Sequence, residues 1–218
     1  MATVLVVGDR ALFTDCLEIV LRSVGYDVQR IPTICPAAAA IAPTVGPYPR
    51  IALVDVDHDQ LGDRGELIEP LARVGIAVVV LTDSLDRGQW GGFVRRGARC
   101  VLAKSAPLPD LHSALRLLSQ GRPVMTRRER AELIEWWRRD REDVDLLRER
   151  FHRLTPREQQ VLADLTQGLG IHDIAVEDVV SEATVRTQVK SILRKLEVPS
   201  QLGAVAVAHR LLGEDASV

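Results

Sequence analysis

Four short apolar runs and one mixed segment, Asp27–Ile31, each followed by a segment of helical periodicity, constrain the fold of this 218-residue chain more than any other feature. Uninterrupted apolar runs of this length are typical of strands that are buried on both faces, as in a parallel sheet. Strands that alternate with helices indicate an α/β domain with a doubly wound, five-stranded parallel sheet in roughly the first 120 residues. The predicted strands are Thr3–Val7, Asp27–Ile31, Ile51–Val54, Ala77–Leu81 and Cys100–Ala103.

The helices predicted between these strands are one directly after the first strand, one in the Ala-rich segment 36–42, Glu66–Val74, Gly88–Arg96 and Asp110–Ser119. The fourth of these helices contains three glycines, Gly88, Gly91 and Gly92. Each interior glycine costs a helix about 0.5–1 kcal/mol relative to alanine. We therefore expect this helix to be the loosest part of the sheet domain.

Residues 127–153 hold 17 charged side chains out of 27 and contain neither Gly nor Pro, which favours one long helix. Asp140 interrupts an apolar seam along this helix, formed at spacings of 4, 7, 3 and 4 by Leu133, Trp137, Val144, Leu147 and Phe151. Two interpretations remain open. The segment is either a solvated linker helix that lies on its own protein, or a helix whose seam pairs two subunits.

The last 65 residues change character and contain the signals of short, capped helices. In "LTPREQQVL", Thr155 can cap a helix and Glu158 completes a capping box. A turn bounded by glycines and a short helix around residues 172–176 follow, and Ser181 is the expected cap of a longer helix. A short helix, a tight turn and a second helix form the helix-turn-helix pattern.

The second helix of this pair has an apolar stripe and a basic face. The stripe, at i, i+4, i+7 and i+11, consists of Val185, Val189, Ile192 and Leu196. Residues 154–218 carry 6 basic and 9 acidic side chains, yet four of the bases fall between positions 186 and 195. We expect base edges to be contacted by Arg186, Thr187 and Lys190, and phosphates by Arg194 and Lys195, with Thr184 as a further DNA-binding residue. The net negative charge predicts weak non-specific DNA affinity and reliance on dimers.

Composition excludes several other classes of protein. No apolar run approaches the roughly 18 residues that a membrane span needs, and the N-terminus lacks the basic start and cleavage site of a secretory signal. We therefore expect a cytoplasmic protein with no membrane partner. Cys16, Cys35 and Cys100 have no metal-ligand spacing and are interpreted as reduced core thiols.

The stretch "LTPREQQVL…IAVEDVVSEATVRTQVKSILRKL" resembles the DNA-binding domain of the LuxR/NarL/FixJ class, from residue 154 to about residue 210. The first 120 residues resemble the receiver domain of two-component response regulators. The resemblance implies a receiver at 1–122, a charged helical linker at 123–153, and an all-α, four-helix LuxR-type helix-turn-helix domain at 154–218. It also implies that a final helix, Leu202–Leu212, pairs two DNA-binding domains, with Val205, Ala206 and Leu212 as candidate contacts.

The receiver resemblance assigns residues at the ends of three predicted strands. Asp55 in "IALVDVD" matches the phosphoacceptor, Thr82 in "VVVLTD" matches the switch hydroxyl, and Lys104 in "GARCVLAKS" matches the phosphate-contacting cation. A carboxylate nucleophile needs a divalent cation and hydrogen-bond donors around the incoming phosphoryl group. The implied cofactor is Mg²⁺, held by Asp9, Asp55 and the backbone carbonyl of Asp57.

The sequence departs from the receiver pattern in four places. Gly8 replaces the first of two acids after the first strand, and Val101 replaces the aromatic switch residue. His58 and Asp59 stand where Met-Pro is usual, and acids crowd Asp55. Two modes of control remain open: phosphorylation of an atypical receiver, or phosphate-independent control by constitutive dimerisation, a small molecule or a partner.

The expected function is that of a bacterial transcription regulator, not an enzyme, that binds a pseudo-palindromic promoter site as a homodimer. A sensor histidine kinase and RNA polymerase are the further partners that the resemblance implies. Two alternatives come from other classes. One is an aspartyl-phosphate-type hydrolase that uses Asp55 and Asp57. The other is a protein-interaction module whose C-terminal domain no longer reads DNA.

Overall fold

The computed structural model describes residues 3–8, 11–31, 50–57 and 64–215. It divides into two compact units, residues 1–139 and 140–218. The helix predicted in residues 36–42 lies outside the described residues. The division falls inside a long helix, α6 (Arg127–His152), which therefore contributes to both units. The domain boundaries expected after residues 122 and 153 remain predictions.

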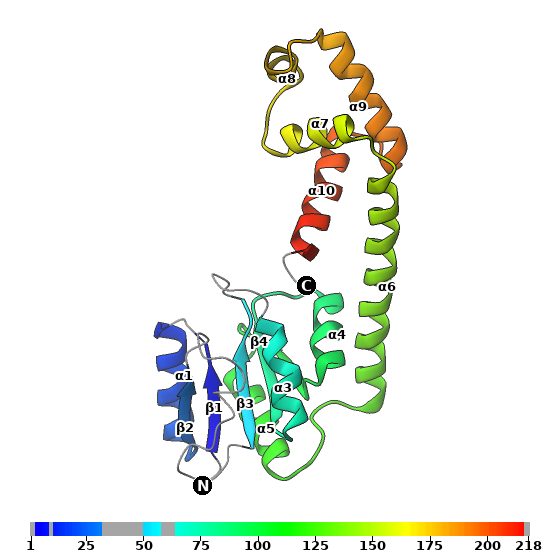
Figure 1. The fold of residues 1–218 in the computed structure, drawn as a ribbon. Coiled ribbons are helices and arrows are strands. Elements are labelled where there is room, and N and C mark those ends of the chain that lie inside the picture. Colours follow the sequence, from blue (N-terminus) through cyan, green and yellow to red (C-terminus); the bar gives the residue numbers. More distant parts are fainter. Residues whose placement is uncertain (1–2, 9–10, 32–49, 58–63, 216–218) are drawn as a thin grey trace. The chain divides into compact units, whose positions relative to one another are not determined.

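The first unit is built on one sheet of five parallel strands in the order β2-β1-β3-β4-β5 (Figure 1). The five predicted strands are confirmed, and the third and fourth are each one residue longer than expected. The strands are β1 (Thr3–Val7), β2 (Asp27–Ile31), β3 (Ile51–Asp55), β4 (Ala77–Thr82) and β5 (Cys100–Ala103).

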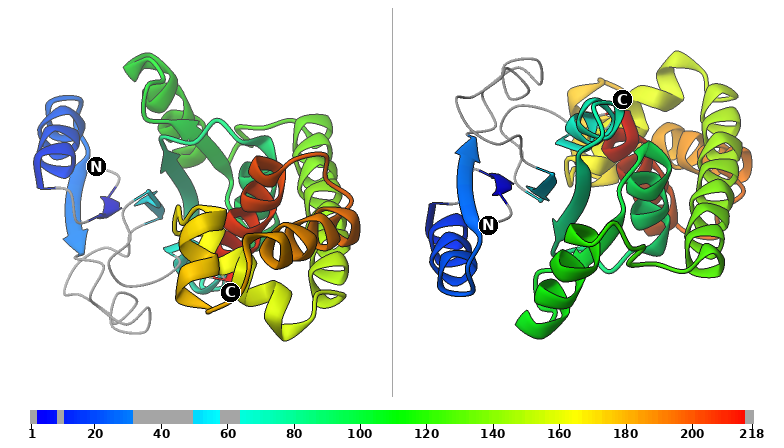
Figure 2. Two further views of the ribbon diagram at one scale, coloured as in Figure 1. Left: turned by 90° about the horizontal axis from the view of Figure 1, so that it is seen from above. Right: turned by 90° about the horizontal axis from the view of Figure 1, so that it is seen from below.

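Helices cover both faces of this sheet, as a doubly wound fold requires. Figure 2 shows α1 (Ala11–Ser23) and α5 (Leu108–Ser119) on one side. The short 3-10 helix η1 (Arg64–Leu67), α3 (Ile68–Arg73) and α4 (Arg87–Arg96) belong to the other side. Alternate residues of β1, β3, β4 and β5 enter the two cores, because successive side chains of a strand point to opposite faces. Burial on both faces explains why β1, β3, β4 and β5 read as apolar runs, whereas the edge strand β2 (DVQRI) carries exposed polar side chains.

The glycines of α4 allow close packing, which corrects the expectation that this helix is the loosest. A Cβ atom at Gly91 would overlap the carbonyl oxygen of Leu133 on α6 and would lie 2.7 Å from Cβ of Trp137. A Cβ atom at Gly92 would lie 3.1 Å from Cδ1 of Trp137. The missing side chains let the backbones of α4 and α6 approach, so the helix cost of glycine is offset by packing.

The apolar seam of α6 packs within the chain, in agreement with the first of the two interpretations. Leu133 is buried in the core of the first unit. Asp140, which interrupts the seam, forms an ion pair with Arg210 of α10 (Gln201–Asp215). Three seam residues pack into the core of the second unit: Val144, Leu147 and Phe151.

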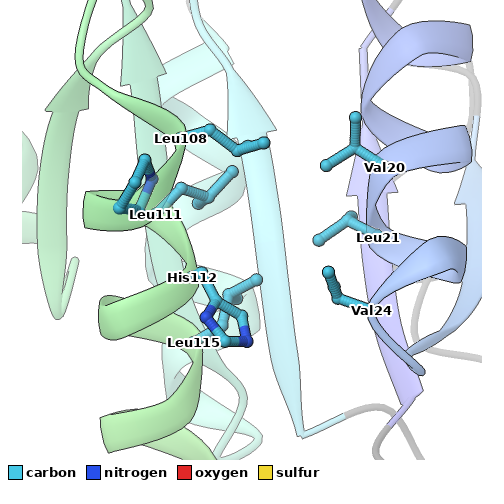
Figure 3. Close-up of a pocket in the computed structure, with 8 residues that line it drawn as sticks. Val20, Leu21, Val24, Leu108, Leu111, His112 and Leu115 are labelled. Carbon is cyan, nitrogen blue, oxygen red and sulfur yellow. The ribbon is translucent and has the colours of Figure 1, made fainter.

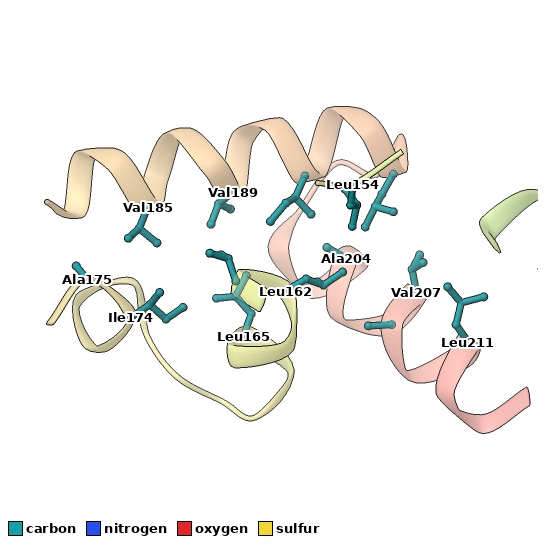
Figure 4. Packing of buried hydrophobic residues seen from close by; sticks show 14 of the residues in the cluster. Leu154, Leu162, Leu165, Ile174, Ala175, Val185, Val189, Ala204, Val207 and Leu211 are labelled. Carbon is teal, nitrogen blue, oxygen red and sulfur yellow. The ribbon is translucent and has the colours of Figure 1, made fainter. Parts of the chain in front are cut away.

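The second unit contains four short helices in residues 154–215, as expected: α7 (Pro156–Thr166), α8 (Ile171–Glu177), α9 (Glu182–Leu196) and α10. They enclose one apolar core. Figure 4 shows Val185 and Val189 of α9 directed toward the interior, where Ile174 of α8 and Leu162 of α7 also lie. This arrangement fixes which face of α9 remains exposed.

Two helix starts follow the capping signals in the sequence. The hydroxyl of Thr155 accepts a hydrogen bond from the backbone nitrogen of Glu158 at 3.3 Å, and Glu158 Oε2 accepts one from the Thr155 nitrogen at 2.7 Å. Ser181 Oγ accepts a hydrogen bond from the Thr184 nitrogen at 3.2 Å. The capping box of α7 and the cap of α9 are therefore confirmed.

Two composition-based expectations meet different outcomes. Burial raises the pKa of Cys100 to about 11, with the charge of Glu129 adding to the effect, as befits a core thiol. Cys16 instead lies exposed on α1, which corrects its assignment to the core, and Cys35 lies outside the described residues. In the part of the chain that the structure describes, no helix is long and apolar enough to cross a membrane.

Candidate functional site

The carboxyl ends of three neighbouring strands bring the predicted receiver residues together. Asp55 ends β3 and Thr82 ends β4, while Lys104 directly follows β5. The backbone nitrogen of Lys104 donates to the carbonyl of Thr82 at 2.8 Å, which joins two of these strand ends. Two further acids complete what we call the Lys104 cluster, which consists of Asp55, Asp57, Thr82, Asp83 and Lys104.

The Lys104 ammonium lies at the centre of this cluster. Its Nζ atom is 2.6 Å from Oδ1 of Asp55, 2.8 Å from Oδ2 of Asp57 and 3.5 Å from Oδ2 of Asp83. The side chains of Lys104 and Asp55 are only 6% and 2% exposed. The ring of Phe13 lies 5.3 Å from Nζ and adds a cation–π contact. Charges this poorly solvated require close partners, and the cluster supplies them.

Asp57 enters the cluster through its side chain, whereas only its backbone carbonyl was expected to take part. Its Oδ1 atom accepts a hydrogen bond from the Thr82 hydroxyl at 2.5 Å. Its Oδ2 atom accepts a short hydrogen bond from the backbone nitrogen of Asp83. The backbone nitrogen of Asp57 in turn donates to Asp55 Oδ1 at 3.2 Å. Asp57 lies in a bend just beyond the end of β3, so the alternation of a strand could not have predicted this contact.

The electrostatics of the cluster hold Asp57 and Lys104 in their charged forms at neutral pH. Partial burial opposes the charge of Asp57, but hydrogen bonds from Lys104, Thr82 and the Asp83 backbone outweigh burial, so its pKa is lowered. Burial also opposes the charge of Lys104. Hydrogen bonds to Asp55 and Asp57, together with their negative charges, raise the pKa of Lys104 above its usual value.

The predicted Mg²⁺ site remains a prediction. Asp9 lies outside the described residues, as do His58 and Asp59. Among the residues that the structure does describe, no group of three or more His, Cys, Asp or Glu side chains could hold a metal ion. Within the cluster, the Lys104 ammonium already lies between carboxylate oxygens of Asp55 and Asp57.

Gly8 occupies a tightly packed position next to the cluster. A Cβ atom at this residue would lie 3.0 Å from Cγ2 of Thr14 and 3.2 Å from Cβ of Asp55. Thr14 is itself buried, and its hydroxyl accepts a hydrogen bond from Arg30 Nη2 at 2.7 Å. Any side chain at position 8 therefore requires Thr14 or Asp55 to shift. Val101, at the aromatic switch position, is buried in the core that includes α4.

The helix-turn-helix of the second unit consists of α8, a turn and α9. The turn contains Val179, which has a φ of 55° and is exposed. A positive φ is uncommon for a β-branched residue, so surrounding contacts must hold this turn. One such contact is the ion pair between Arg157, at the start of α7, and Asp178 in the turn.

The two faces of α9 differ as the sequence predicted. The four residues of the apolar stripe are all buried in the core of the second unit. The opposite face is exposed and presents Thr184, Arg186, Thr187, Lys190 and Arg194. Glu182, in the first turn of α9, was not predicted as part of this face. Its carboxylate pairs with Arg186 at 3.1 Å and with His172 Nδ1 at 3.0 Å.

Lys195 takes a different position from the other predicted DNA contacts. Its side chain is 24% exposed, and its Nζ atom lies 2.6 Å from Oε2 of Glu158 on α7. Burial opposes the charge of Glu158, but hydrogen bonds from Lys195, the Thr155 backbone and Ser191 lower its pKa to about 2. Lys195 thus joins α9 to the start of α7.

An apolar pocket of about 240 Å³ lies between α1 and α5 (Figure 3). Val20, Leu21 and Val24 project from α1 toward the side chains of α5. The α5 side is formed by Leu108, Pro109, Leu111, His112 and Leu115. No residue that was predicted to bind a ligand lines it.

Comparison with known proteins decides the family. Residues 152–208 match the family model described as bacterial regulatory proteins of the luxR family. The nitrate/nitrite response regulator NarP of Escherichia coli is 30% identical over 157 residues, which are 71% of each chain. This chain belongs to the NarL/FixJ family of response regulators. The family consists of DNA-binding transcription regulators with a LuxR-type helix-turn-helix.

Other relatives of this response regulator agree with that assignment. The transcriptional regulatory protein DesR of Bacillus subtilis is 28% identical over 158 residues, which are 72% of this chain and 71% of DesR. A solved structure of the response regulator RcsB from Salmonella typhimurium has a TM-score of 0.50 and 19% identity. That match covers 96% of this chain and 100% of the RcsB chain, and it supports the fold alone.

Proposed function

We propose that this response regulator binds promoter DNA as a homodimer through the exposed face of α9 and thereby changes transcription. The observation that carries the proposal is the division of α9 into a fully buried apolar stripe and an exposed face with three bases and two threonines. The second helix of a helix-turn-helix lies in the major groove, with its N-terminal residues at base edges.

Individual roles follow from position along α9. Arg186 and Lys190 lie one turn apart, and Arg186 can donate two parallel hydrogen bonds to a guanine edge. The carboxylate of Glu182, 3.1 Å from the Arg186 guanidinium, helps to orient that side chain. Thr184 precedes Arg186 and Thr187 lies between the two bases, and Arg194 is assigned to phosphate. Lys195 is reassigned from a phosphate contact to the internal pair with Glu158.

Dimer formation compensates for a small number of cations. Residues 154–218 carry 6 basic and 9 acidic side chains, so one DNA-binding unit neutralises few phosphates. Two units on half-sites about one helical turn apart double those contacts. The proposed pairing surface is α10, where Leu202, Ala206 and Leu212 are exposed and Val205 is half-buried.

Control through the receiver has two candidate modes. Phosphorylation of Asp55 by a sensor kinase is supported by a buried carboxylate at a strand end beside Lys104 and Thr82. In that mode Asp55 and the Asp57 carbonyl, with Asp9, would hold Mg²⁺, which would neutralise the incoming phosphoryl group. Phosphate-independent control is supported by the tight packing around Gly8 and by the hydrogen bond that the Thr82 hydroxyl donates to the Asp57 carboxylate. We favour this second mode.

The alternatives from other classes have less support. An aspartyl-phosphate-type hydrolase would need the Asp57 carboxylate for catalysis, yet that carboxylate already accepts a hydrogen bond from Thr82 and pairs with Lys104. An interaction module that no longer reads DNA would leave the exposed bases of α9 without a role. RNA polymerase remains the partner through which a DNA-bound dimer would act.

The proposal is tested by selecting duplexes from a random-sequence library with the full-length chain. We expect enrichment of a pseudo-palindrome with half-sites about 10 base pairs apart, centre to centre. Light scattering of the purified complex should give two chains per duplex. Enrichment of no sequence, or one chain per duplex at saturation, would contradict the proposal.

A further inference from the structure

We propose that Asp57 is the resident anion of the receiver: its carboxylate occupies the hydrogen-bond donors on which a phosphoryl group attached to Asp55 would depend. The inference concerns the Lys104 cluster alone. It goes beyond the proposed function, because it neither requires nor implies DNA binding.

Three donors from two strand ends converge on this one carboxylate. The Thr82 hydroxyl reaches Oδ1 at 2.5 Å, while the Asp83 backbone nitrogen and the Lys104 ammonium, the latter at 2.8 Å, reach Oδ2. A hydroxyl, a backbone N–H group and an ammonium aimed at one point form a donor set suited to an oxyanion. The resemblance assigns two of these donors, Thr82 and Lys104, to the phosphoryl group.

The donors cannot serve two anions at once. A threonine hydroxyl has a single proton to donate, and Asp57 Oδ1 receives the one from Thr82. A backbone N–H group likewise has one proton, and that of Asp83 is directed at Asp57 Oδ2. An oxyanion beside Asp55 must therefore displace the Asp57 carboxylate or bind without these donors. Its negative charge would also meet that of Asp57.

The same contacts fix the segment that leads into α4. Thr82 Oγ1 accepts a hydrogen bond from the Ser84 nitrogen at 3.1 Å, and the Ser84 carbonyl accepts one from Trp90 Nε1 at 2.8 Å. Asp57 thus holds the Thr82 hydroxyl in place. A chain of hydrogen bonds through Thr82 and Ser84 then connects Asp57 to Trp90 of α4. In this arrangement a carboxylate of the chain itself takes the place of an added phosphoryl group as the anion that positions Thr82.

Rescue by an added oxyanion tests the proposal. The full chain is kept free of divalent metal, and orthophosphate is titrated against chloride at equal ionic strength. Asp57→Ala removes the carboxylate and opens its space, whereas Asp57→Asn removes the charge and fills the space. Asp83→Asn is the matched control, because it removes an exposed acid 3.5 Å from Lys104 and leaves Asp57 in place. The readouts are the backbone amide signal of residue 83 and the melting temperature.

We expect a saturable shift of the residue-83 amide signal with orthophosphate in Asp57→Ala, together with a rise in melting temperature of about 2–4 °C. Wild type, Asp57→Asn and Asp83→Asn should show neither effect. Equal phosphate binding by wild type and Asp57→Ala, or no binding by Asp57→Ala, would overturn the proposal.

A second measurement does not need the alanine variant to fold. The residue-83 amide proton should move upfield in Asp57→Asn relative to wild type, because its acceptor loses its charge. An unchanged signal would show that the Asp57–Asp83 hydrogen bond does not exist, and the proposal would fall. Neither result depends on DNA, so failure here leaves the proposed function of α9 untouched.

Discussion

The ammonium of Lys195 lies 2.6 Å from the carboxylate of Glu158, and the two side chains are only 24% and 9% exposed. A base that the helical pattern assigned to DNA phosphates therefore stabilises the DNA-binding unit from within. The same carboxylate closes the capping box of α7. One acid thus supports both the start of α7 and the position of the last turn of α9.

This pair predicts acid sensitivity of the second unit. The pKa of Glu158 is lowered to about 2 from 4.5, so its contribution is fully present above about pH 4.5 and is lost as pH falls toward 2. The full shift corresponds to at most about 3 kcal/mol. Urea unfolding can be followed at the amide signals of α9. At neutral pH, Glu158→Gln should have a lower free energy of unfolding than wild type. This difference in free energy should shrink as pH falls from about 4.5 to 2. Glu177→Gln, at an exposed acid of α8, should change little.

Packing of α4 against α6 predicts that Gly91→Ala is strongly destabilising. The added methyl group would overlap the backbone carbonyl of Leu133, which cannot move without shifting α6. Overpacking of this kind costs about 1–3 kcal/mol, and we expect the upper part of that range. Gly92→Ala is the control, because its methyl group would meet the Trp137 side chain at 3.1 Å, which can adjust. Thermal unfolding of both variants measures the difference, and equal melting temperatures would disprove this packing role.

Gly8→Asp restores the acidic pair of the receiver pattern, and we expect it to lower the stability of the protein when no metal ion is present. The new side chain requires a small shift of Thr14 or Asp55, and it brings a second carboxylate beside the buried Asp55. We expect Gly8→Asp to melt below Gly8→Ala in the presence of a chelator, and Mg²⁺ to raise the melting temperature of Gly8→Asp only. A rise with Mg²⁺ in wild type as well would show that the remaining acids already bind the ion.

Phosphate-independent control predicts no stable phosphorylation of wild type. After incubation with acetyl phosphate and Mg²⁺, Phos-tag electrophoresis should show one unshifted band for wild type and for Asp55→Ala. The double variant Gly8→Asp/Asp57→Ala, which restores the acid and vacates the donors, should gain a shifted band that depends on Asp55. A persistent shifted band in wild type that is absent in Asp55→Ala would instead establish phosphorylation.

The strands and most helices could be predicted from the sequence because their signals are local. The apolar runs of β1 and β3 and the caps at Thr155 and Ser181 report on neighbouring residues only. The close approach of Gly91 to Leu133 could not be predicted, because those residues are far apart in the sequence. In the sequence, a glycine indicates only a low helix propensity and does not indicate which helix packs against it.

Three members of the candidate site were predictable, but the side chains of Asp57 and Asp83 and the hydrogen bonds of the cluster were not. Strand ends placed Asp55, Thr82 and Lys104 together, since parallel strands end at one edge. Which carboxylate oxygen receives the Thr82 proton depends on side-chain geometry that a pattern does not contain. For the same reason Lys195 was grouped with the exposed bases, although its partner Glu158 lies 37 residues earlier.

The most direct test of the central claim compares Lys190→Ala with Lys195→Gln on a duplex selected by the wild-type chain. Lys190 is exposed on the proposed DNA-reading face of α9, whereas the Lys195 ammonium is paired internally. We predict that Lys190→Ala weakens specific binding by about 10- to 100-fold with an unchanged melting temperature. Lys195→Gln should lower the melting temperature with a smaller loss of affinity. Wild-type affinity in Lys190→Ala, with the fold intact, would contradict the account.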